Sequence, residues 1–431
     1  MSREPDRARA RRRRVGWRAG LTVVLAAALA VSGTTPAHAD TVRDLEYWLN
    51  DYGFTTAWTT SRGEGVTVAV IDTGVNGDVA ELTGVIIGGT DVSGLGSDDG
   101  QTPVGEENEH GTMVASLLAG RGTGEGNGVI GVAPDAELLT ASVAFGQDTG
   151  SEKTNDEQIA EAVRWAVDSG ADVINMSLTR NTADWPESWD DAFLYAFEND
   201  VVVVAAAGNR GSGTTSVGAP ATIPGVLTVA GVDRDQNASF DASSQGITIA
   251  VSAPSEDLVG VLPDGSYVQW SGTSAAAPIV SGLVALVRSE FPELDAANVI
   301  NRVIRTADPK GEAVPSPLYG YGIIDPVTAL TAEVEAVEAN PLGSLEDWIR
   351  VHRRADLPAE DGGGGDAEEI VPIADPPPPR SDSAKTLLPT AWTIAYITVP
   401  LSLVAGFGTL AALLGIGATR HIRRTTRTGT R

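Results

Sequence analysis

The chain has 431 residues, contains no cysteine and carries a formal net charge of −27. The missing cysteines exclude a disulfide framework, a cysteine-ligated zinc site and a cysteine nucleophile. Acidity on this scale argues against nucleic acid as a partner, because the protein would repel phosphates. Both ends are nevertheless basic, with eight Arg against two acids in residues 1–39 and five Arg and no acid in residues 418–431. The part between them is therefore even more acidic than the total.

The first 39 residues have the pattern of a secretory signal peptide. Arginines at 11–14 precede a short apolar run at 21–31, and residues 37–39 (Ala-His-Ala) place small side chains at the two positions that define cleavage. An uncleaved N-terminal anchor is the alternative, but the apolar run is short for a membrane span. We therefore predict export and cleavage after residue 39. We expect residues 40–62 to form a short leader that packs on the domain that follows it in the sequence.

Residues 63–335 predict one α/β domain. Four apolar, valine-rich runs have the character of buried strands: Val66–Ile71, Asp172–Met176, Val201–Ala206 and Gly225–Val232. Four further segments have helical spacing and length: 156–169, 189–199, 274–289 and 295–306. Strands that alternate with helices predict a mostly parallel sheet with helices on both faces. Such a sheet binds its ligands beyond the carboxyl ends of its strands.

The sequence of the C-terminal part predicts a stalk followed by a membrane anchor. Residues 336–390 are predicted to be a juxtadomain segment followed, at about 355–388, by an acidic stalk whose four-glycine run and four-proline run cannot form a packed core. Residues 391–417 are predicted to be a transmembrane helix, because from Trp392 on they carry no charge and at ~1.5 Å per residue exceed the ~30 Å hydrocarbon layer. The alternative, a buried core helix, has nothing comparable left to cover it. The arginines of 418–431 fit a cytoplasmic tail.

Four polar residues of the domain are candidates for a catalytic site. Asp72 ends an apolar strand, His110 is the only histidine in the domain, Ser274 opens a helix among small residues, and Asn209 follows a buried strand. Each has a plainer explanation when taken alone: a turn cap, a structural imidazole, a helix N-cap and a turn residue. Their sequence contexts decide between these explanations.

Those contexts resemble the subtilases, a family of serine proteases. Asp-Thr-Gly at 72–74, His-Gly-Thr at 110–112 and Gly-Thr-Ser-Ala-Ala-Ala-Pro at 272–278 resemble its three signatures, in the order Asp, His, Ser. Ala-Ala-Gly-Asn at 206–209 is similar to its oxyanion segment. The likeness spans about residues 57–332 and implies a subtilisin-like three-layer fold.

The resemblance also implies a mechanism of acyl transfer. Ser274 is the expected nucleophile, His110 the general base and acid, and Asp72 the residue that holds the His110 tautomer. Asn209 and the Ser274 N–H are expected to bind the oxyanion. Catalysis of this kind requires no cofactor. Structural Ca²⁺ is frequent in subtilases, but no segment here has the loop spacing that would locate its ligands.

Ser177 and Leu178 resemble the substrate-binding strand of subtilases. The family usually has glycine next, whereas this chain has Thr179. The wall of the first specificity pocket therefore departs from the family pattern. The substrates implied are proteins or peptides, but their side-chain preference is left open.

The whole layout is similar to that of the mycosins, the membrane-anchored subtilases of actinobacterial type VII secretion systems. A short leader, a stalk, a C-terminal span and a basic tail carry this likeness, as does the segment from Tyr319 to Leu330. The lack of cysteine is a departure, since many mycosins have a disulfide pair. The resemblance implies an endopeptidase that cleaves exported proteins at the outer face of the cell membrane, with type VII components as partners. The alternative is a structural subunit that stabilises a secretion complex and whose protease activity is dispensable. A tethered binding module would not need all four catalytic positions.

Overall fold

The structure is a computed structural model that describes residues 41–146, 149–353 and 399–427. The chain separates into two units, divided between residues 377 and 378. The predicted signal peptide at 1–39, most of the predicted stalk at 336–390 and the start of the predicted span at 391–417 lie outside the described residues.

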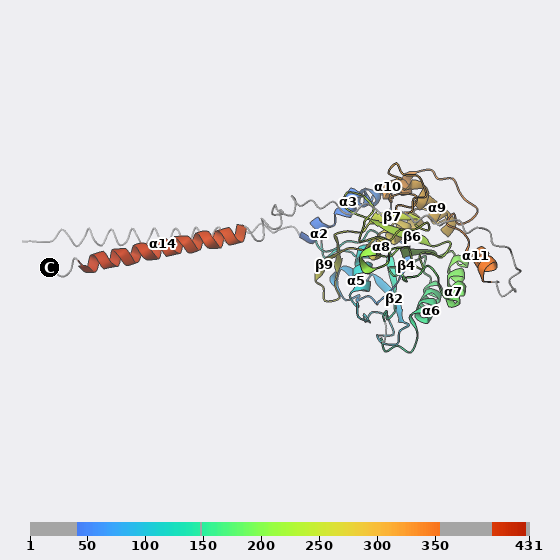
Figure 1. Ribbon diagram of the computed structural model, residues 1–431, viewed down its shortest axis with the longest axis horizontal. Coiled ribbons are helices and arrows are strands. Elements are labelled where there is room, and N and C mark those ends of the chain that lie inside the picture. Colours follow the sequence, from blue (N-terminus) through green and yellow to red (C-terminus); the bar gives the residue numbers. More distant parts are fainter. Residues whose placement is uncertain (1–40, 147–148, 354–398, 428–431) are drawn as a thin grey trace, which may run out of the picture. The chain divides into compact units, whose positions relative to one another are not determined.

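The first unit is built on a parallel sheet (Figure 1). In the described part of the chain its seven strands are β1 (Thr67–Asp72), β2 (Ile86–Asp91), β3 (Glu137–Ser142), β4 (Val173–Met176), β5 (Val202–Ala206), β6 (Leu227–Val232) and β7 (Val251–Pro254). They lie in the order β2-β3-β1-β4-β5-β6-β7, and every neighbouring pair is parallel. The predicted parallel α/β sheet is therefore confirmed. The sequence predicted β1, β4, β5 and β6, but not β2, β3 and β7.

Helices cover both faces of this sheet. Those of one face are α5 (His110–Ala119), α8 (Thr273–Glu290) and α9 (Ala296–Thr306), and those of the other are α6 (Asn155–Asp168) and α7 (Glu187–Glu198). Strand β1 shows the alternation that this requires: Val68 and Val70 face the core with α5 and α8, whereas Ala69 and Ile71 face the core with α6 and α7. The three-layer arrangement is thus as predicted.

The N-terminal segment packs on the α5/α8 face. It contains three short helices, α2 (Thr41–Leu45), α3 (Tyr47–Asp51) and α4 (Phe54–Ala57). Trp48 and Phe54 are fully buried in the same core as α8. The Trp58 Nε1–H donates to the Val132 carbonyl oxygen at 2.8 Å. The leader therefore belongs to the packed body of the domain.

Smaller elements complete the first unit. They are the 3-10 turns η1 (Ala80–Leu82) and η2 (Arg210–Ser212), the antiparallel hairpin of β8 (Leu258–Val261) and β9 (Tyr267–Trp270), and the helices α10 (Pro326–Thr331) and α11 (Leu345–His352). Helix α11 is anchored by Leu345, which is buried in the α6/α7 core. Arg353, just after it, bonds to Asp190 of α7 with Nε 2.8 Å from Oδ2. The packed body thus reaches Arg353.

The second unit is described as one helix, α14 (Val399–Arg427). Within the described ranges, no helix combines the length and the apolar character that a membrane crossing needs. The predicted span at 391–417 overlaps α14 only from Val399 onward.

Candidate active site

Three elements bring the predicted catalytic residues to the carboxyl edge of the sheet. Asp72 is the last residue of β1, His110 is the first residue of α5, and Ser274 is the second residue of α8. His110 and Ser274 line one cavity of about 400 Å³, together with Asn209, Ser177 and other residues. The cavity lies where an open parallel sheet binds its ligands.

Asp72 holds the His110 ring by two contacts. The Nδ1 atom of His110 lies 2.8 Å from Oδ1 and 3.0 Å from Oδ2 of Asp72. The carboxyl group is 1% exposed, and its Oδ1 also accepts the Thr73 N–H at 2.7 Å. A carboxylate accepts the Nδ1 hydrogen, so the other ring nitrogen, Nε2, is left as the basic atom.

The pKa of His110 is raised above its ordinary value. Burial is the largest influence and lowers the pKa, but the charge of Asp72 and its hydrogen bond raise it, and Glu107 and Glu109 raise it further. The opposing effects leave a net rise in the pKa, because the nearby carboxylates and the hydrogen bond together favour the charged imidazolium more than burial penalises it.

A close backbone approach places His110 against the end of β1. A Cβ at Gly111 would lie 2.2 Å from the Gly74 carbonyl oxygen, so only glycine fits there. The Gly111 N–H donates to Thr73 Oγ1 at 3.0 Å, which fixes the first turn of α5 on the Asp-Thr-Gly segment. The two sequence signatures therefore pack directly on each other.

Ser274 is tied to the end of β4 by two reciprocal bonds. Its hydroxyl donates to the Ser177 carbonyl oxygen at 3.1 Å, and the Ser177 hydroxyl donates to the Ser274 carbonyl oxygen at 2.8 Å. Among the described residues, this is the one hydrogen-bond partner of the Ser274 hydroxyl. The hydroxyl thus bonds to Ser177 and not to His110 in this structure, and catalytic hydrogen bonds often form or tighten only when substrate is bound.

The side-chain amide of Asn209 is oriented by Thr273. Its Oδ1 accepts the Thr273 N–H at 2.8 Å and the Thr273 hydroxyl at 3.0 Å, so its Nδ2 is left to donate elsewhere. Thr273 Oγ1 in turn accepts the Gly208 N–H at 3.0 Å, which directs its own hydrogen to Asn209. A Cβ at Gly272 would lie 2.9 Å from Nδ2, and the glycine φ of +153° is one that side chains rarely adopt.

Two residues with roles at the site were not singled out from the sequence. Thr273 stands inside the Gly-Thr-Ser signature, and its position there was the available signal. The ring of Trp270 meets the His110 ring edge to face, with centroids 5.5 Å apart. Trp270 comes from the β8–β9 hairpin, and no local pattern in the sequence indicated that contact.

The predicted substrate strand also reaches the cavity. Ser177, Leu178 and Thr179 all line it. No residue of the described leader does, since the lining residues run from Thr73 to Ser274. Among the described residues, no group of three or more His, Asp or Glu side chains is placed to hold a metal ion.

Comparison of the sequence with known protein families and proteins identifies one family to which it is similar. The model of the subtilase family matches residues 63–322. Mycosin-3 of Mycobacterium tuberculosis is 34% identical over 421 residues, which cover 84% of this chain and 80% of the mycosin. Subtilisin DY of Bacillus licheniformis is 36% identical over 268 residues, or 61% of this chain and 90% of the subtilisin.

Solved structures agree with this result. The MycP3 protease from the type VII (ESX-3) secretion system superposes with a TM-score of 0.58 and 34% identity, covering 66% of this chain and 88% of MycP3. MycP1 from Mycobacterium smegmatis gives a TM-score of 0.58 and 32% identity over 68% of this chain and 87% of MycP1. Both the sequence and the fold are thus similar to those of mycosins. The chain belongs to the subtilase family of subtilisin-like serine proteases.

Proposed function

We propose that this protein is an endopeptidase whose catalytic triad is Asp72, His110 and Ser274. The proposal is carried by the paired contacts of His110 Nδ1 with both Asp72 oxygens, beside Ser274 in one cavity. A carboxylate on Nδ1 selects the tautomer with a basic Nε2, and this is the nitrogen that activates a serine hydroxyl.

The reaction proceeds through an acyl-enzyme. Ser274 Oγ bonds to the substrate carbonyl carbon, and its proton moves to His110 Nε2. The peptide C–N bond then breaks, and the proton leaves with the amine. Water repeats both steps on the ester and restores the Ser274 hydroxyl. Asp72 stays ionised and balances the imidazolium, and no cofactor takes part.

The cavity supplies the remaining groups. Asn209 Nδ2 and the Ser274 N–H donate to the oxyanion, and the N-terminus of α8 favours negative charge at this point. Ser177 and Leu178 contact the bound substrate. Thr179, which stands where the family usually has glycine, narrows the wall beside them and alters the preference for the substrate side chain.

Acidification is expected to reduce kcat/KM as His110 takes up a proton. Only the neutral imidazole accepts the serine proton, and the raised pKa of His110 moves this loss to higher pH than an ordinary histidine would give. Glu107→Gln removes one of the charges that raise this pKa, so the acid limb of the profile should move to lower pH. The measurement is a pH–rate profile of peptide hydrolysis.

Glu312→Gln, which removes an exposed carboxylate, is the matched control for this profile. Its acid limb should coincide with that of the wild type. A limb that moves to higher pH in Glu107→Gln, or equally in both variants, would contradict the assignment.

Asn209→Ala should lower kcat about 10²- to 10³-fold and change KM little, because the amide bonds to a charge that exists only in the transition state. Thr273→Val, which removes the hydroxyl that orients Asn209, should lower kcat in the same way but less. Thr273→Ser keeps the hydroxyl and should stay close to the wild type. Steady-state kinetics decide the matter, and a raised KM at unchanged kcat would instead assign Asn209 to substrate binding.

We further propose that the protein is exported and held at the outer face of the cell membrane. The support is the sequence, which has a signal-peptide pattern at 1–39, an uncharged run within 391–417 and a basic segment at 418–431. The similarity to MycP3, a protease of a type VII secretion system, suggests that exported proteins are its substrates and secretion components its partners.

Intact cells that express the full chain test both proposals. A membrane-impermeant fluorophosphonate probe should label the wild type and not Ser274→Ala, and alkaline carbonate should leave the labelled protein in the membrane fraction. Labelling that occurs only after lysis would refute the location at the outer face. Release of the labelled protein by carbonate would refute the membrane anchoring, and neither result would count against the peptidase. A folded wild type that no probe labels would count against the protease and favour the structural-subunit alternative, which co-purification with secretion components then examines.

A further inference from the structure

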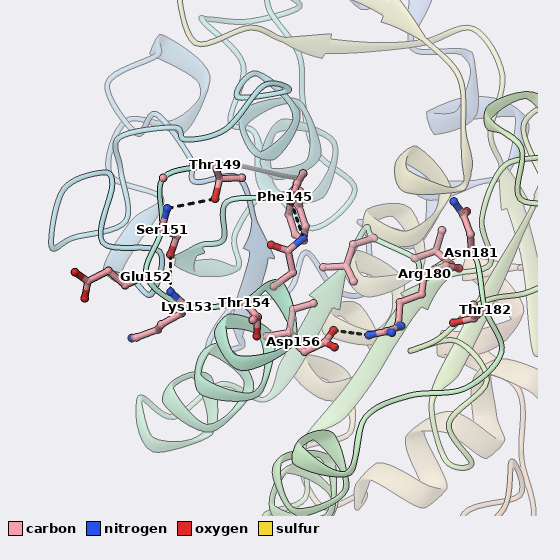
Figure 2. A pocket seen from close by; sticks show the side chains of 16 residues that line it. Phe145, Thr149, Ser151, Glu152, Lys153, Thr154, Asp156, Arg180, Asn181 and Thr182 are labelled. Atoms are coloured by element: carbon pink, nitrogen blue, oxygen red, sulfur yellow. Dashed lines mark hydrogen bonds and ion pairs between the residues drawn. The ribbon is translucent and has the colours of Figure 1, made fainter.

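A second and larger cavity adjoins the catalytic one. It has a volume of about 1050 Å³ and is walled by residues within 145–146, 149–159 and 178–182 (Figure 2). Phe145, Gly146, Leu178 and Thr179 line both cavities. A peptide bound along Leu178 and Thr179, as the proposed function requires, would therefore contact residues that line both cavities.

An ion pair forms part of its wall. Arg180 Nη1 bonds to Asp156 Oδ1, and the two labelled side chains point toward each other in Figure 2. Their side chains are 35% and 37% exposed, so both are accessible from the cavity. The pair thus offers hydrogen-bond donors and acceptors side by side to whatever enters.

Contacts with neighbouring residues fix the positions of Arg180 and Asp156. The Arg180 guanidinium lies 5.5 Å from the ring centroid of Trp189, which is fully buried. The Trp189 Nε1–H donates to the Asp156 backbone oxygen at 3.0 Å, and the Arg180 N–H donates to the Ala219 oxygen at 2.7 Å. Fixed groups of this kind discriminate between ligands better than mobile surface charges do.

Most of the bonding capacity of the pair is unused. Among the described residues, Nη1 to Oδ1 is the one hydrogen bond of both side chains. The other N–H donors of Arg180 and the second oxygen of Asp156 are therefore available to a ligand. The remaining charged lining residues, Glu152 and Lys153, lie on the opposite side of the view, and the Lys153 ammonium is 2.5 Å from Glu161 (Figure 2).

We propose that Arg180 and Asp156 are specificity-determining residues that select an uncharged, hydrogen-bonding side chain, best an amide, at one substrate position away from the scissile bond. An amide oxygen accepts from Arg180 while the amide NH₂ donates to Asp156. A carboxylate meets repulsion from Asp156, and an ammonium meets repulsion from Arg180. A large apolar side chain removes water from the unused donors of Arg180 and the second oxygen of Asp156 without bonding to them. The inference rests on the proposed peptidase activity.

Removing one charge at a time should convert this neutral preference into a charged one. Asp156→Asn leaves the charge of Arg180 uncompensated, so substrates with an acidic side chain at this position should be cleaved with higher kcat/KM. Arg180→Gln leaves the charge of Asp156 uncompensated, so substrates with a basic side chain there should be cleaved with higher kcat/KM. The double variant carries no charge at either position and should return to a neutral preference.

The experiment uses the full chain in detergent and internally quenched peptides in which Gln, Glu, Lys or Leu stands at each position in turn. The wild type should prefer Gln at a single position. At that position Asp156→Asn should improve kcat/KM for Glu relative to Lys by about threefold to tenfold at low salt, with a smaller change at high salt, and Arg180→Gln should reverse the sign. Asp347→Asn, which breaks an exposed ion pair with Arg350 outside the cavity, is the control of equal charge change.

Fluorophosphonate titration of Ser274 normalises every rate to active sites, which separates this inference from the peptidase proposal. Active variants whose selectivity equals that of the wild type at every position would overturn the inference and leave the peptidase standing. The same selectivity change in Asp347→Asn would overturn it too, because net charge would then explain the result. Probe-labelled protein that cleaves no peptide would count against both proposals.

Discussion

Ser274→Ala is expected to lower kcat about 10⁶-fold, which is the size of loss that subtilisin shows when its serine is removed. The loss is large because no other group in the cavity replaces the nucleophile, so the remaining rate comes from the oxyanion donors and binding alone. His110 and Asp72 act through the same serine. Removing either of them in addition to Ser274 should therefore cost little more, and single and double variants measured in parallel would show this.

The control for this variant lies three residues away. The Ser271 hydroxyl accepts the Asp257 N–H at 3.0 Å and has no place in the proposed mechanism. Ser271→Ala should therefore keep nearly all activity and probe labelling, whereas Ser274→Ala should lose both while its thermal unfolding stays close to that of the wild type. A Ser274→Ala protein that still hydrolyses peptides after purification from a protease-free host would disprove the assignment.

The proposed catalytic residues could be selected from the sequence, because short signatures contain them. What the signatures do not contain is their mutual geometry. The bond from the Ser274 hydroxyl to the Ser177 oxygen and the orientation of Asn209 by Thr273 join segments far apart in the chain. Such contacts follow from the packing of α8 against β4 and β5, so local patterns could not reveal them.

The fold, too, could be predicted where local sequence patterns indicate it, but not where it depends on contacts between distant segments. Strands β1, β4, β5 and β6 are runs of β-branched residues buried on both faces, which periodicity detects. Strand β2 (IIGGTD) contains two glycines and is largely half-exposed at the edge of the sheet, so it lacks that signal. Strand β3 (ELLTAS) is buried almost throughout, but leucine, glutamate and alanine favour helix locally, and only its pairing with β1 makes it a strand.

Trp48→Ala should lower the free energy of unfolding by about 3–5 kcal/mol, the usual cost of removing a large buried aromatic side chain. The indole is fully buried between the leader and the α8 core, so its loss leaves a cavity that the surrounding core cannot fill. Its Nε1–H is buried and has no partner among the residues that the structure describes, and an unpaired buried donor itself costs stability. Trp48→Phe should therefore lose much less, since it keeps most of the ring and removes the unpaired donor. Urea unfolding midpoints measure both.

The same variants distinguish a structural leader from an inhibitory one. If the leader blocked the cavity, loosening it would raise peptide turnover per titrated active site. The described leader residues do not line the cavity, so turnover per site should stay constant while stability falls. Thr55→Ala is the control, because within the described part of the chain its exposed hydroxyl bonds only to Asn50 of the leader. Higher turnover per site in Trp48→Ala would mean that the leader restrains the enzyme, and an unchanged unfolding midpoint would mean that the leader does not help to hold the α8 core together.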